Sequence, residues 1–184
     1  MNDGILVFVT DSYAIKTSIA EALSITKTFS GNQHMTINWV CKHHSDLGKE
    51  QLYAILQLRA DVFVVEQKCL YQDIDGQDLE GDTCHLMAWD EDRLAAYLRL
   101  LDPQLQGGDV VIGRVITAPD YRGQGLGHEL IAQALKQAQK HWPDMPIYLS
   151  AQAHLQGYYG RYGFEVAGEE YLEDGIPHIG MRRP

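Results

Sequence analysis

Three observations predict a mixed α/β domain with helices on both faces of a central sheet. The chain has 184 residues, a length that suits one domain with a sizeable core. Short apolar runs typical of strands alternate with segments of helical periodicity along most of the sequence. One run, VVIGRVITAP at residues 110–119, is almost continuously apolar or β-branched, which is typical of a central strand buried on both faces.

The first half of the chain is expected to form a strand, a helix and a hairpin, in that order. TINWVCKHH, residues 36–44, predicts the first strand. From Gln51 to Gln67 apolar residues recur at helical spacing, which predicts an amphipathic helix of two parts. After a polar, acidic loop, HLMAWD and RLAAYLRLLD at residues 85–90 and 93–102 predict an antiparallel hairpin.

The second half is expected to add the central strand, two helices and a final strand pair. The helix after Gly127 is expected to end near Trp142, before two prolines. Its inner stripe consists of Leu130, Ile131, Leu135 and Ala138. IYLSA predicts the next strand, and HLQGYYGRYGF predicts a short helix that ends at Gly163. EVAGEEYL and HIGMRR predict two strands joined by a turn at residues 173–177.

Residues 1–34 differ from the rest of the chain, because they are rich in Thr and Ser and lack the pattern that follows. We interpret residues 1–34 as an N-terminal extension and residues 35–184 as the domain, with Met35 as its natural start. The alternative is an ordinary N-terminal subdomain with a short helix near SIAEALSI. The extension hypothesis fails if deleting residues 1–34 abolishes folding.

Charge and hydropathy argue against two classes of partner. The formal net charge is -10, which disfavours a broad basic face for nucleic acid. No run approaches the roughly 20 apolar residues of a membrane span. The short run ILVFV follows Asp3 and lacks the basic flank of a secretory signal. We therefore expect neither a nucleic-acid nor a membrane partner.

The three cysteines, Cys41, Cys69 and Cys84, show neither a CxxC pair nor a zinc-binding spacing. A sparse, odd set is typical of reduced, buried thiols in a cytoplasmic protein, so no metal is expected. Cys84 precedes His85 directly, but adjacent residues on a strand point to opposite faces. The two are therefore not expected to form a nucleophile and its base.

A glycine-rich turn, YRGQGLG at residues 121–127, joins the expected central strand to the following helix. The first amides of a helix lack intrahelical partners, and the helix dipole is positive at that end. Glycines let a ligand approach the backbone closely, so that several amides converge on an anion, most often a phosphate. Arg122 adds a positive charge at the same place. The turn therefore predicts a pyrophosphate cradle; the alternative is a helix start with incidental glycines.

Two common phosphate-binding fingerprints do not fit this turn. The triphosphate loop requires GxxxxGK followed by Ser or Thr, and the turn has neither the spacing nor the lysine. The dinucleotide fingerprint GxGxxG fails because its last position is His128. A nucleotide- or nicotinamide-binding protein is therefore disfavoured. The turn does match Arg-x-x-Gly-x-Gly, through Arg122, Gly125 and Gly127.

That pattern resembles the coenzyme A signature of the Gcn5-related N-acetyltransferases. Residues 113–131 are similar to the family's fourth strand, loop and third helix, and residues 147–164 to its fifth strand and fourth helix. VFVVEQKCLYQDIDGQDLEGD, AQAHLQ and EDGIPHIGM resemble the ElaA branch of this superfamily. The resemblance covers residues 36–183. It implies a strongly twisted sheet that splits between its fourth and fifth strands, with acetyl-coenzyme A in the split.

The resemblance also implies which residues bind the cofactor. The backbone of Val115, Ile116 and Thr117 is expected to pair with the pantetheine arm as an added strand would. The pyrophosphate is expected on the amides of the turn, which are those of Arg122, Gly123, Gln124, Gly125, Leu126 and Gly127. Many relatives carry Asn where this chain has Gln152. The amide is retained, so a hydrogen bond to the cofactor is still expected, with a different reach.

Tyr159 lies four residues before Gly163, where many family members carry the tyrosine that protonates the departing sulfur. In the implied reaction a neutral amine attacks the thioester, and coenzyme A leaves as a thiolate. Tyr159 is then both a contact of the cofactor and the general acid. The alternative is that Tyr158, Tyr159 and Tyr162 are aromatic packing on a short helix.

The general base is left open among three residues. Glu66 closes the first helix, His85 begins a strand that is expected to face the cleft, and His154 lies at the mouth of the last helix. Each histidine has a structural alternative. A base is required because the attacking amine must lose a proton, directly or through water.

The acidic loop DIDGQDLEGD, residues 73–82, does not fit a calcium-binding loop. Its glycine falls at the fourth position rather than the sixth, and no glutamate occupies the twelfth. The loop is either solvated or attracts a cationic amine through Asp73, Asp75 or Asp78. The segment EDGIPH is expected to form the other wall of the acceptor site, with His178 facing inward.

The sequence therefore predicts a cytoplasmic N-acetyltransferase of class EC 2.3.1 that uses acetyl-coenzyme A and an unidentified small-molecule or protein amine. No metal is expected, and a homodimer is considered because dimers are common in the family. The alternative is a non-catalytic module that binds or senses acyl-coenzyme A on the same fold.

Overall fold

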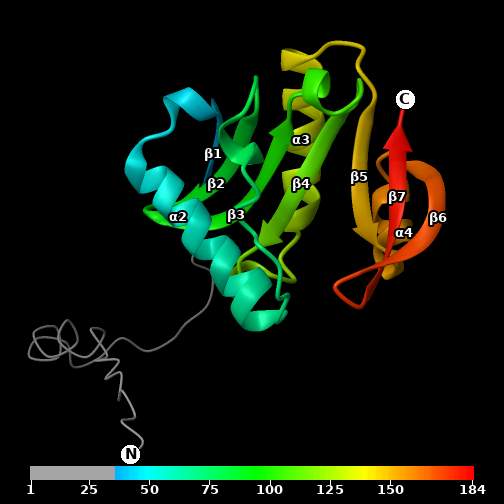
Figure 1. Cartoon of the computed structure of the whole chain (residues 1–184). Coiled ribbons are helices and arrows are strands. Elements are labelled where there is room, and N and C mark those ends of the chain that lie inside the picture. The colour runs from blue at the N-terminus through cyan, green and yellow to red at the C-terminus, as the bar shows by residue number, and fades with distance from the viewer. Residues whose placement is uncertain (1–35) are drawn as a thin grey trace, which may run out of the picture. The chain divides into compact units, whose positions relative to one another are not determined.

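The computed structural model describes residues 36–184, so the expectations for residues 1–34 lie outside the described part of the chain. Seven strands form one sheet in the order β1-β2-β3-β4-β5-β7-β6 (Figure 1). All neighbouring strands pair antiparallel except β4 and β5, which pair in parallel. The predicted mixed α/β class is confirmed.

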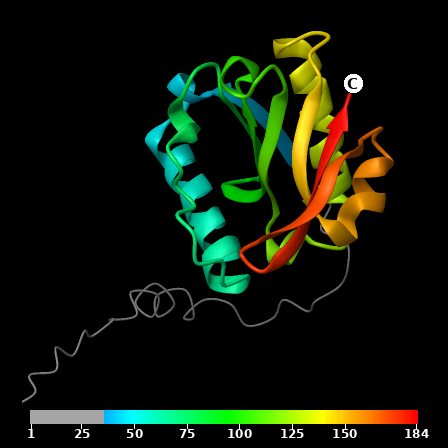
Figure 2. The ribbon, with the colours of Figure 1, turned by 45° about the vertical axis from the view of Figure 1, so that its right-hand side comes forward.

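The strands are β1 (Ile37–His43), β2 (Cys84–Asp90), β3 (Arg93–Leu101), β4 (Val110–Thr117), β5 (Ile147–Gln152), β6 (Glu165–Glu173) and β7 (Ile176–Arg183). The main helices are α2 (Lys49–Arg59), α3 (Leu126–His141) and α4 (Gln156–Gly160). Figures 1 and 2 show α2 on one face of the sheet and α3 on the other. Within residues 36–184, no helix combines the length and apolar character that crossing a membrane requires.

The helix predicted in two parts is confirmed, because α2 continues directly into the π-helical segment η3 (Ala60–Glu66). The backbone amide of Gln67 donates to the carbonyl of Val62, five residues earlier. Ile55, Leu58 and Val62 form the buried side of this helix. η3 ends at Glu66, which forms an ion pair with Arg122 of the glycine-rich turn.

The strand predicted to be buried on both faces, β4, has buried residues on both faces, but not along its whole length. Ile112 is opposite Leu100 and Ile116 is opposite Tyr97, and these two residues of β3 point to opposite faces. Val110, Ile112 and Ile116 are buried, whereas the residues between them are half-buried. Two residues of β4 oppose one residue of β3 between the pairs Arg99–Gly113 and Tyr97–Ile116, which defines a bulge. The half-buried residues are explained by the neighbouring strand, because β5 leaves β4 after three residue pairs.

The core fills the two spaces between sheet and helices. β2 and β3 contribute Leu86, Met87, Leu98 and Leu100, all at most 1% exposed. The inner stripe predicted for α3 is confirmed at Leu130, Ile131 and Ala138; Ala134 completes it, and Leu135 is half-buried at its margin.

Candidate functional site

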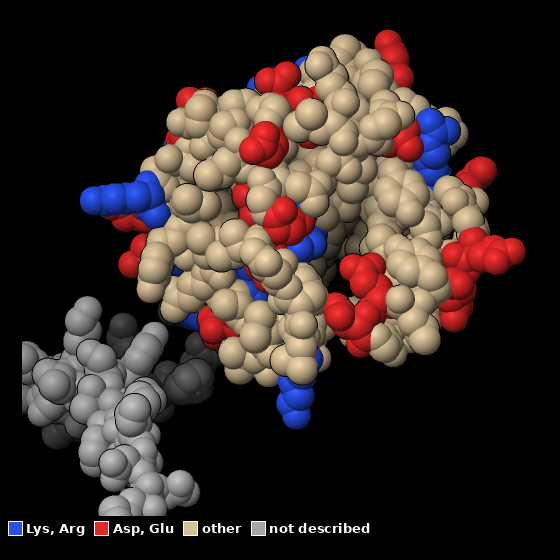
Figure 3. Space-filling view, viewed as in Figure 1, with Lys and Arg blue, Asp and Glu red and all other residues tan. Residues whose placement is uncertain are grey.

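The divergence of β4 and β5 leaves a cavity of about 740 Å³ between them (Figure 3). The strands pair only from Val110 to Ile112 and from Ile147 to Leu149. Residues 111–115 of β4 and 148–152 of β5 then line opposite sides of the cavity. The split between the fourth and fifth strands, implied by the resemblance, is therefore present.

Beyond Ile112, the edge of β4 that faces this split pairs with no strand of residues 36–184. Val115 lines the cavity, while Ile116 and Thr117 pair with β3 on their other side. Backbone groups on such an edge are free to pair with an extended ligand. Gln152, at the end of β5, also lines the cavity, so its side-chain amide lies on the opposite bank.

At the end of β4, the glycine-rich turn presents a row of backbone amides. Gly123 and Gly125 have φ of +74° and +87°, in the left-handed region that favours glycine. The amides of residues 123–127 have no hydrogen-bond acceptor within residues 36–184. They lie at the positive end of the 16-residue helix α3. The geometry suits an anion, as the sequence predicted.

Gly127, the last glycine of the turn, lies close to the end of β4 and to Tyr158. A Cβ on Gly127 would lie 3.4 Å from Thr117 Oγ1 and 3.4 Å from Tyr158 Oη. Both distances are at the lower limit of ordinary van der Waals contact, so α3 packs closely against the end of β4 and leaves little room for a side chain larger than a methyl group. Tyr158 therefore lies against the turn, while the next residue, Tyr159, lines the cavity.

The side chain of Arg122 is directed at Glu66 rather than left free at the turn. Arg122 Nη1 and Nη2 donate to the two carboxylate oxygens of Glu66 at 2.7 and 2.9 Å, and Nε donates to the carbonyl of Thr117 at 3.0 Å. These hydrogen bonds lower the pKa of Glu66. The charge predicted to serve the cradle is therefore matched by a carboxylate. Glu66 does not line the cavity, and its engaged, ionised carboxylate is a poor general base.

His85 lies in the core and does not face the cleft, so that prediction is wrong. Its side chain is fully buried, with Nδ1 2.8 Å from Tyr97 Oη and Nε2 2.9 Å from the carbonyl of Asp78. A carbonyl only accepts, so Nε2 carries the proton and Nδ1 accepts from Tyr97. Burial lowers the pKa of His85 and keeps it neutral. His154 is exposed and does not line the cavity either.

Tyr159 reaches the cavity from α4. Its ring is 6% exposed and packs edge-on against Tyr158 and Phe164. Its hydroxyl has no hydrogen-bond partner among the described residues, and burial raises the pKa of Tyr159 to about 12. A protonated donor therefore lines the cavity. The packing alternative describes Tyr162 better, because its hydroxyl is bound to the ring and the carbonyl of His128.

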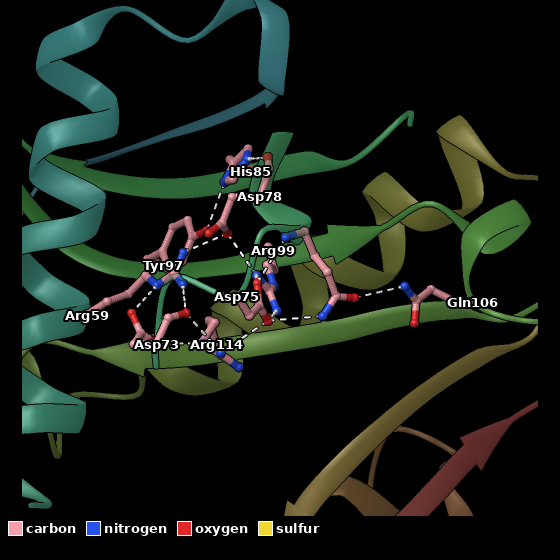
Figure 4. A network of polar contacts seen from close by, with 10 residues as sticks. Arg59, Asp73, Asp75, Asp78, His85, Tyr97, Arg99, Gln106 and Arg114 are labelled. Carbon is pink, nitrogen blue, oxygen red and sulfur yellow. Dashed lines mark hydrogen bonds and ion pairs between the residues drawn. The ribbon is translucent and has the colours of Figure 1, made fainter. Parts of the chain in front are cut away.

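The acidic loop is neutralised by arginines on one side of the cavity (Figure 4). The network consists of Asp73, Asp75, Asp78, Arg59, Arg99 and Arg114. Burial opposes ionisation of Asp75 and Asp78, but hydrogen bonds from the arginines lower the pKa of both. Three carboxylates face three guanidinium groups. The hypothesis that this loop attracts a cationic amine therefore lacks the free negative charge that it needs.

The opposite wall keeps its negative charge. Glu173 and Asp174, at the β6–β7 turn, line the cavity and form no ion pair within the described chain. Figure 3 shows acidic side chains gathered on this rim of the hollow. A cation entering the cavity therefore meets an attractive wall on one side and a neutral wall on the other.

His178 lines the cavity, as expected for the acceptor wall, and is a further candidate for the base beside Glu66, His85 and His154. Its Nδ1 lies 2.9 Å from the carbonyl of Ile176, which can only accept. Nδ1 therefore carries a proton, and in the neutral imidazole Nε2 is the nitrogen with the lone pair. No local pattern marks this histidine, because its position depends on the pairing of β7 with β5.

Comparisons with known proteins agree with this geometry. The family model described as "Acetyltransferase (GNAT) domain" matches residues 44–183. Protein ElaA of Escherichia coli K12 is 54% identical over 147 residues, which cover 80% of this chain and 96% of that protein. The crystal structure of an acyl-CoA N-acyltransferase from Pseudomonas aeruginosa is 64% identical, with a TM-score of 0.80 over 81% of this chain and all of that one. The crystal structure of E. coli ElaA follows, with 52% identity and a TM-score of 0.78 over the same shares. The chain therefore belongs to the GNAT acetyltransferase family, in its ElaA branch.

Proposed function

We propose that this protein transfers an acetyl group from acetyl-coenzyme A to a primary amine of a small molecule or protein. The observation that carries the proposal is the unpaired edge of β4 beyond Ile112, which runs between the free amides of residues 123–127 at the end of the strand and the cavity that Tyr159 lines. Phosphate, pantetheine and thioester follow one another in the same order along coenzyme A. Membership of the family supports an acyl-coenzyme A donor.

The donor is held mainly by main-chain groups in this proposal. The free amides of residues 123–127 bind the pyrophosphate, helped by the α3 dipole. The β4 edge at Val115, Ile116 and Thr117 pairs with the pantetheine arm. Gln152 donates or accepts a hydrogen bond through its amide from the β5 side.

Tyr159 acts on the leaving sulfur. The amine attacks the thioester carbon, and the C–S bond breaks to leave the coenzyme A thiolate. An ordinary thiol has a pKa of about 8.5, roughly 3.5 units below that of Tyr159, so complete proton transfer is unfavourable by about 5 kcal/mol. The phenol therefore stabilises the developing thiolate as a hydrogen-bond donor, and the sulfur takes its final proton from water or from the protonated base.

His178 is the base in this scheme. Its free Nε2 faces the cavity, whereas Glu66 is occupied by Arg122 and His85 is buried. Glu173 and Asp174 attract the ammonium form of the acceptor. His178 then takes a proton from the amine, so that nitrogen attacks with its lone pair.

The test compares two adjacent tyrosines. Calorimetry measures acetyl-coenzyme A binding, and release of free thiol against a panel of amines measures turnover. For Tyr159→Phe we expect kcat to fall about 100-fold or more, with little change in donor affinity. Tyr158→Phe is the matched control, because its neighbour, and not Tyr158, lines the cavity. A wild-type kcat in Tyr159→Phe refutes the role of the phenol.

The alternative is a non-catalytic acyl-coenzyme A sensor on the same fold. Its signature is tight binding of acetyl-coenzyme A by the wild-type protein with no thiol release on any amine class. Turnover on a single class of amine excludes this alternative and begins to define the acceptor. His178→Gln separates the two further, because a sensor has no need of a base.

A further inference from the structure

Two cysteines and a histidine from distant parts of the sequence meet away from the substrate cavity. They are Cys41 on β1, Cys84 at the start of β2 and His141 at the end of α3. One donor atom of each, two Sγ and one imidazole nitrogen, lies within 4.8 Å of the others. None of the three lines the cavity between β4 and β5.

The sheet register explains why the thiols meet. In the antiparallel pair β1–β2, Cys41 is opposite Leu86 and Cys84 is opposite His43. The two cysteines are therefore diagonal neighbours, and their side chains point to the same face of the sheet. Cys84 is 2% exposed, Cys41 is half-buried and His141 is exposed. An ion can thus reach two sheltered sulfurs past a solvent-exposed imidazole.

We propose that Cys41, Cys84 and His141 bind a single Zn²⁺ ion, with water in the fourth position. Thiolate and imidazole are the ligands that Zn²⁺ prefers. Tetrahedral coordination, with Zn–S of about 2.3 Å and Zn–N of about 2.0 Å, places the donors roughly 3.5–3.8 Å apart. Donors already within 4.8 Å of one another reach that spacing through small side-chain movements.

The surroundings favour a cation on balance. Asp46 and Asp82 lie close enough to Cys84 to act on it electrostatically, while Lys140 lies near Cys41 and opposes them. The Cys84 thiol now donates a weak hydrogen bond to the carbonyl of Asp82 at 3.5 Å. Zinc binding replaces that contact when the thiol loses its proton.

The ion is expected to stabilise the fold rather than to take part in acyl transfer. α3 begins at the glycine-rich turn and has 16 residues, so His141 lies about 24 Å along the helix from the cradle. Zinc would join the C-terminal end of α3 to β1 and β2. It should therefore raise the melting temperature and leave both acetyl-coenzyme A affinity and thiol release unchanged.

Cobalt is the probe, because Co²⁺ bound to thiolate gives an intense near-ultraviolet charge-transfer band. The full chain is reduced, freed of metal, titrated with Co²⁺ and then with Zn²⁺. We expect one equivalent of Co²⁺ with a thiolate band, displacement by Zn²⁺, and no competition from Mg²⁺, which prefers oxygen ligands. Zn²⁺ should also raise the melting temperature.

His141→Ala is the main variant, since removing an exposed side chain leaves the core intact. Losing a direct ligand should weaken Co²⁺ binding by at least about 100-fold, because even an outer contact costs 10- to 100-fold. Cys84→Ser should lose most of the thiolate band, while Cys69→Ser, the matched control, should keep it. The proposal is overturned if the reduced wild type shows no thiolate band, or if Cys69→Ser abolishes the band and the other variants do not.

Discussion

Replacing Gly125 with alanine tests whether the glycine-rich turn binds the pyrophosphate. The backbone strain that this change introduces can be reproduced at a second glycine outside the turn, which serves as the control. Gly125 has φ of +87°, and a Cβ there would meet no atom within 4 Å. The cost to the free protein is therefore the strain of a left-handed alanine, about 1–2 kcal/mol. Gly107 has φ of +72° and equally open surroundings. Gly107→Ala should lower the free energy of unfolding by a similar amount, measured by urea denaturation.

Of these two variants, only Gly125→Ala should weaken the binding of acetyl-coenzyme A. An alanine at position 125 relieves its strain by rotating the backbone, which turns at least one amide away from the pyrophosphate. Losing one hydrogen bond to a charged group costs about 1.5–3 kcal/mol, which corresponds to a roughly 10- to 150-fold higher Kd for acetyl-coenzyme A. The kcat at saturating donor should stay close to that of the wild type, because the thioester itself is held elsewhere.

Two outcomes of this calorimetric comparison refute the reasoning. An unchanged Kd in both Gly125→Ala and Gly127→Ala would mean that the amides of the turn do not bind the pyrophosphate. An equal loss of affinity in Gly107→Ala would mean that backbone strain anywhere in the domain weakens the binding of acetyl-coenzyme A. The pair therefore separates a local role of the turn from a general loss of stability.

Three further predictions concern the charged groups. Arg59→Met leaves buried carboxylates without their full set of positive partners, and should lower the free energy of unfolding by about 3–5 kcal/mol. Arg114→Met removes a partly exposed arginine and should lower it by less, so equal urea midpoints for the two variants would contradict the prediction. Because the pKa values of Asp75 and Asp78 are lowered in the folded state, their contribution to stability is complete above about pH 4 and is lost as the pH falls further. The urea midpoint of the wild type should therefore drop below about pH 4, and the midpoint of Arg59→Met should depend less steeply on pH. Glu66→Gln frees a guanidinium beside the cradle and should lower the KM for acetyl-coenzyme A in thiol-release assays; a higher KM would show that the pair positions the turn instead.

The secondary structure was predictable wherever periodicity and punctuation agreed. The stripe on α3 and the prolines after Trp142 predicted that helix and its end. The hairpin of β2 and β3 followed from two apolar runs around a short polar turn. The burial of β4 was predicted in part: both faces carry buried residues, but a continuous β-branched run does not reveal that a neighbouring strand departs after three residue pairs.

The candidate site shows where a single sequence stops being informative. The glycine-rich turn was predictable because its backbone enters the left-handed region at Gly123 and Gly125, and glycine is the residue that favours this region. His85 was misplaced because alternation along a strand identifies a face, and not what covers it. His85 is opposite Arg99, which lines the cavity, but it lies one strand farther from the split and is enclosed by Tyr97 and Asp78. Cys41, Cys84 and His141 escaped notice because strand register and the far end of α3, rather than sequence spacing, bring them together.

The two walls of the cavity differ in construction, and this difference suggests how donor and acceptor are divided between them. The donor side is built from β4, the start of α3 and the buried ion pairs of Arg59 and Arg99, so a change there disturbs the core. The acceptor side is carried by β6, whose nine residues are all exposed, and by its turn into β7. Substitutions in an exposed strand cost little stability. If the proposed division holds, acceptor choice can change along the β6–β7 hairpin while coenzyme A binding by main-chain atoms of β4 and the turn stays the same.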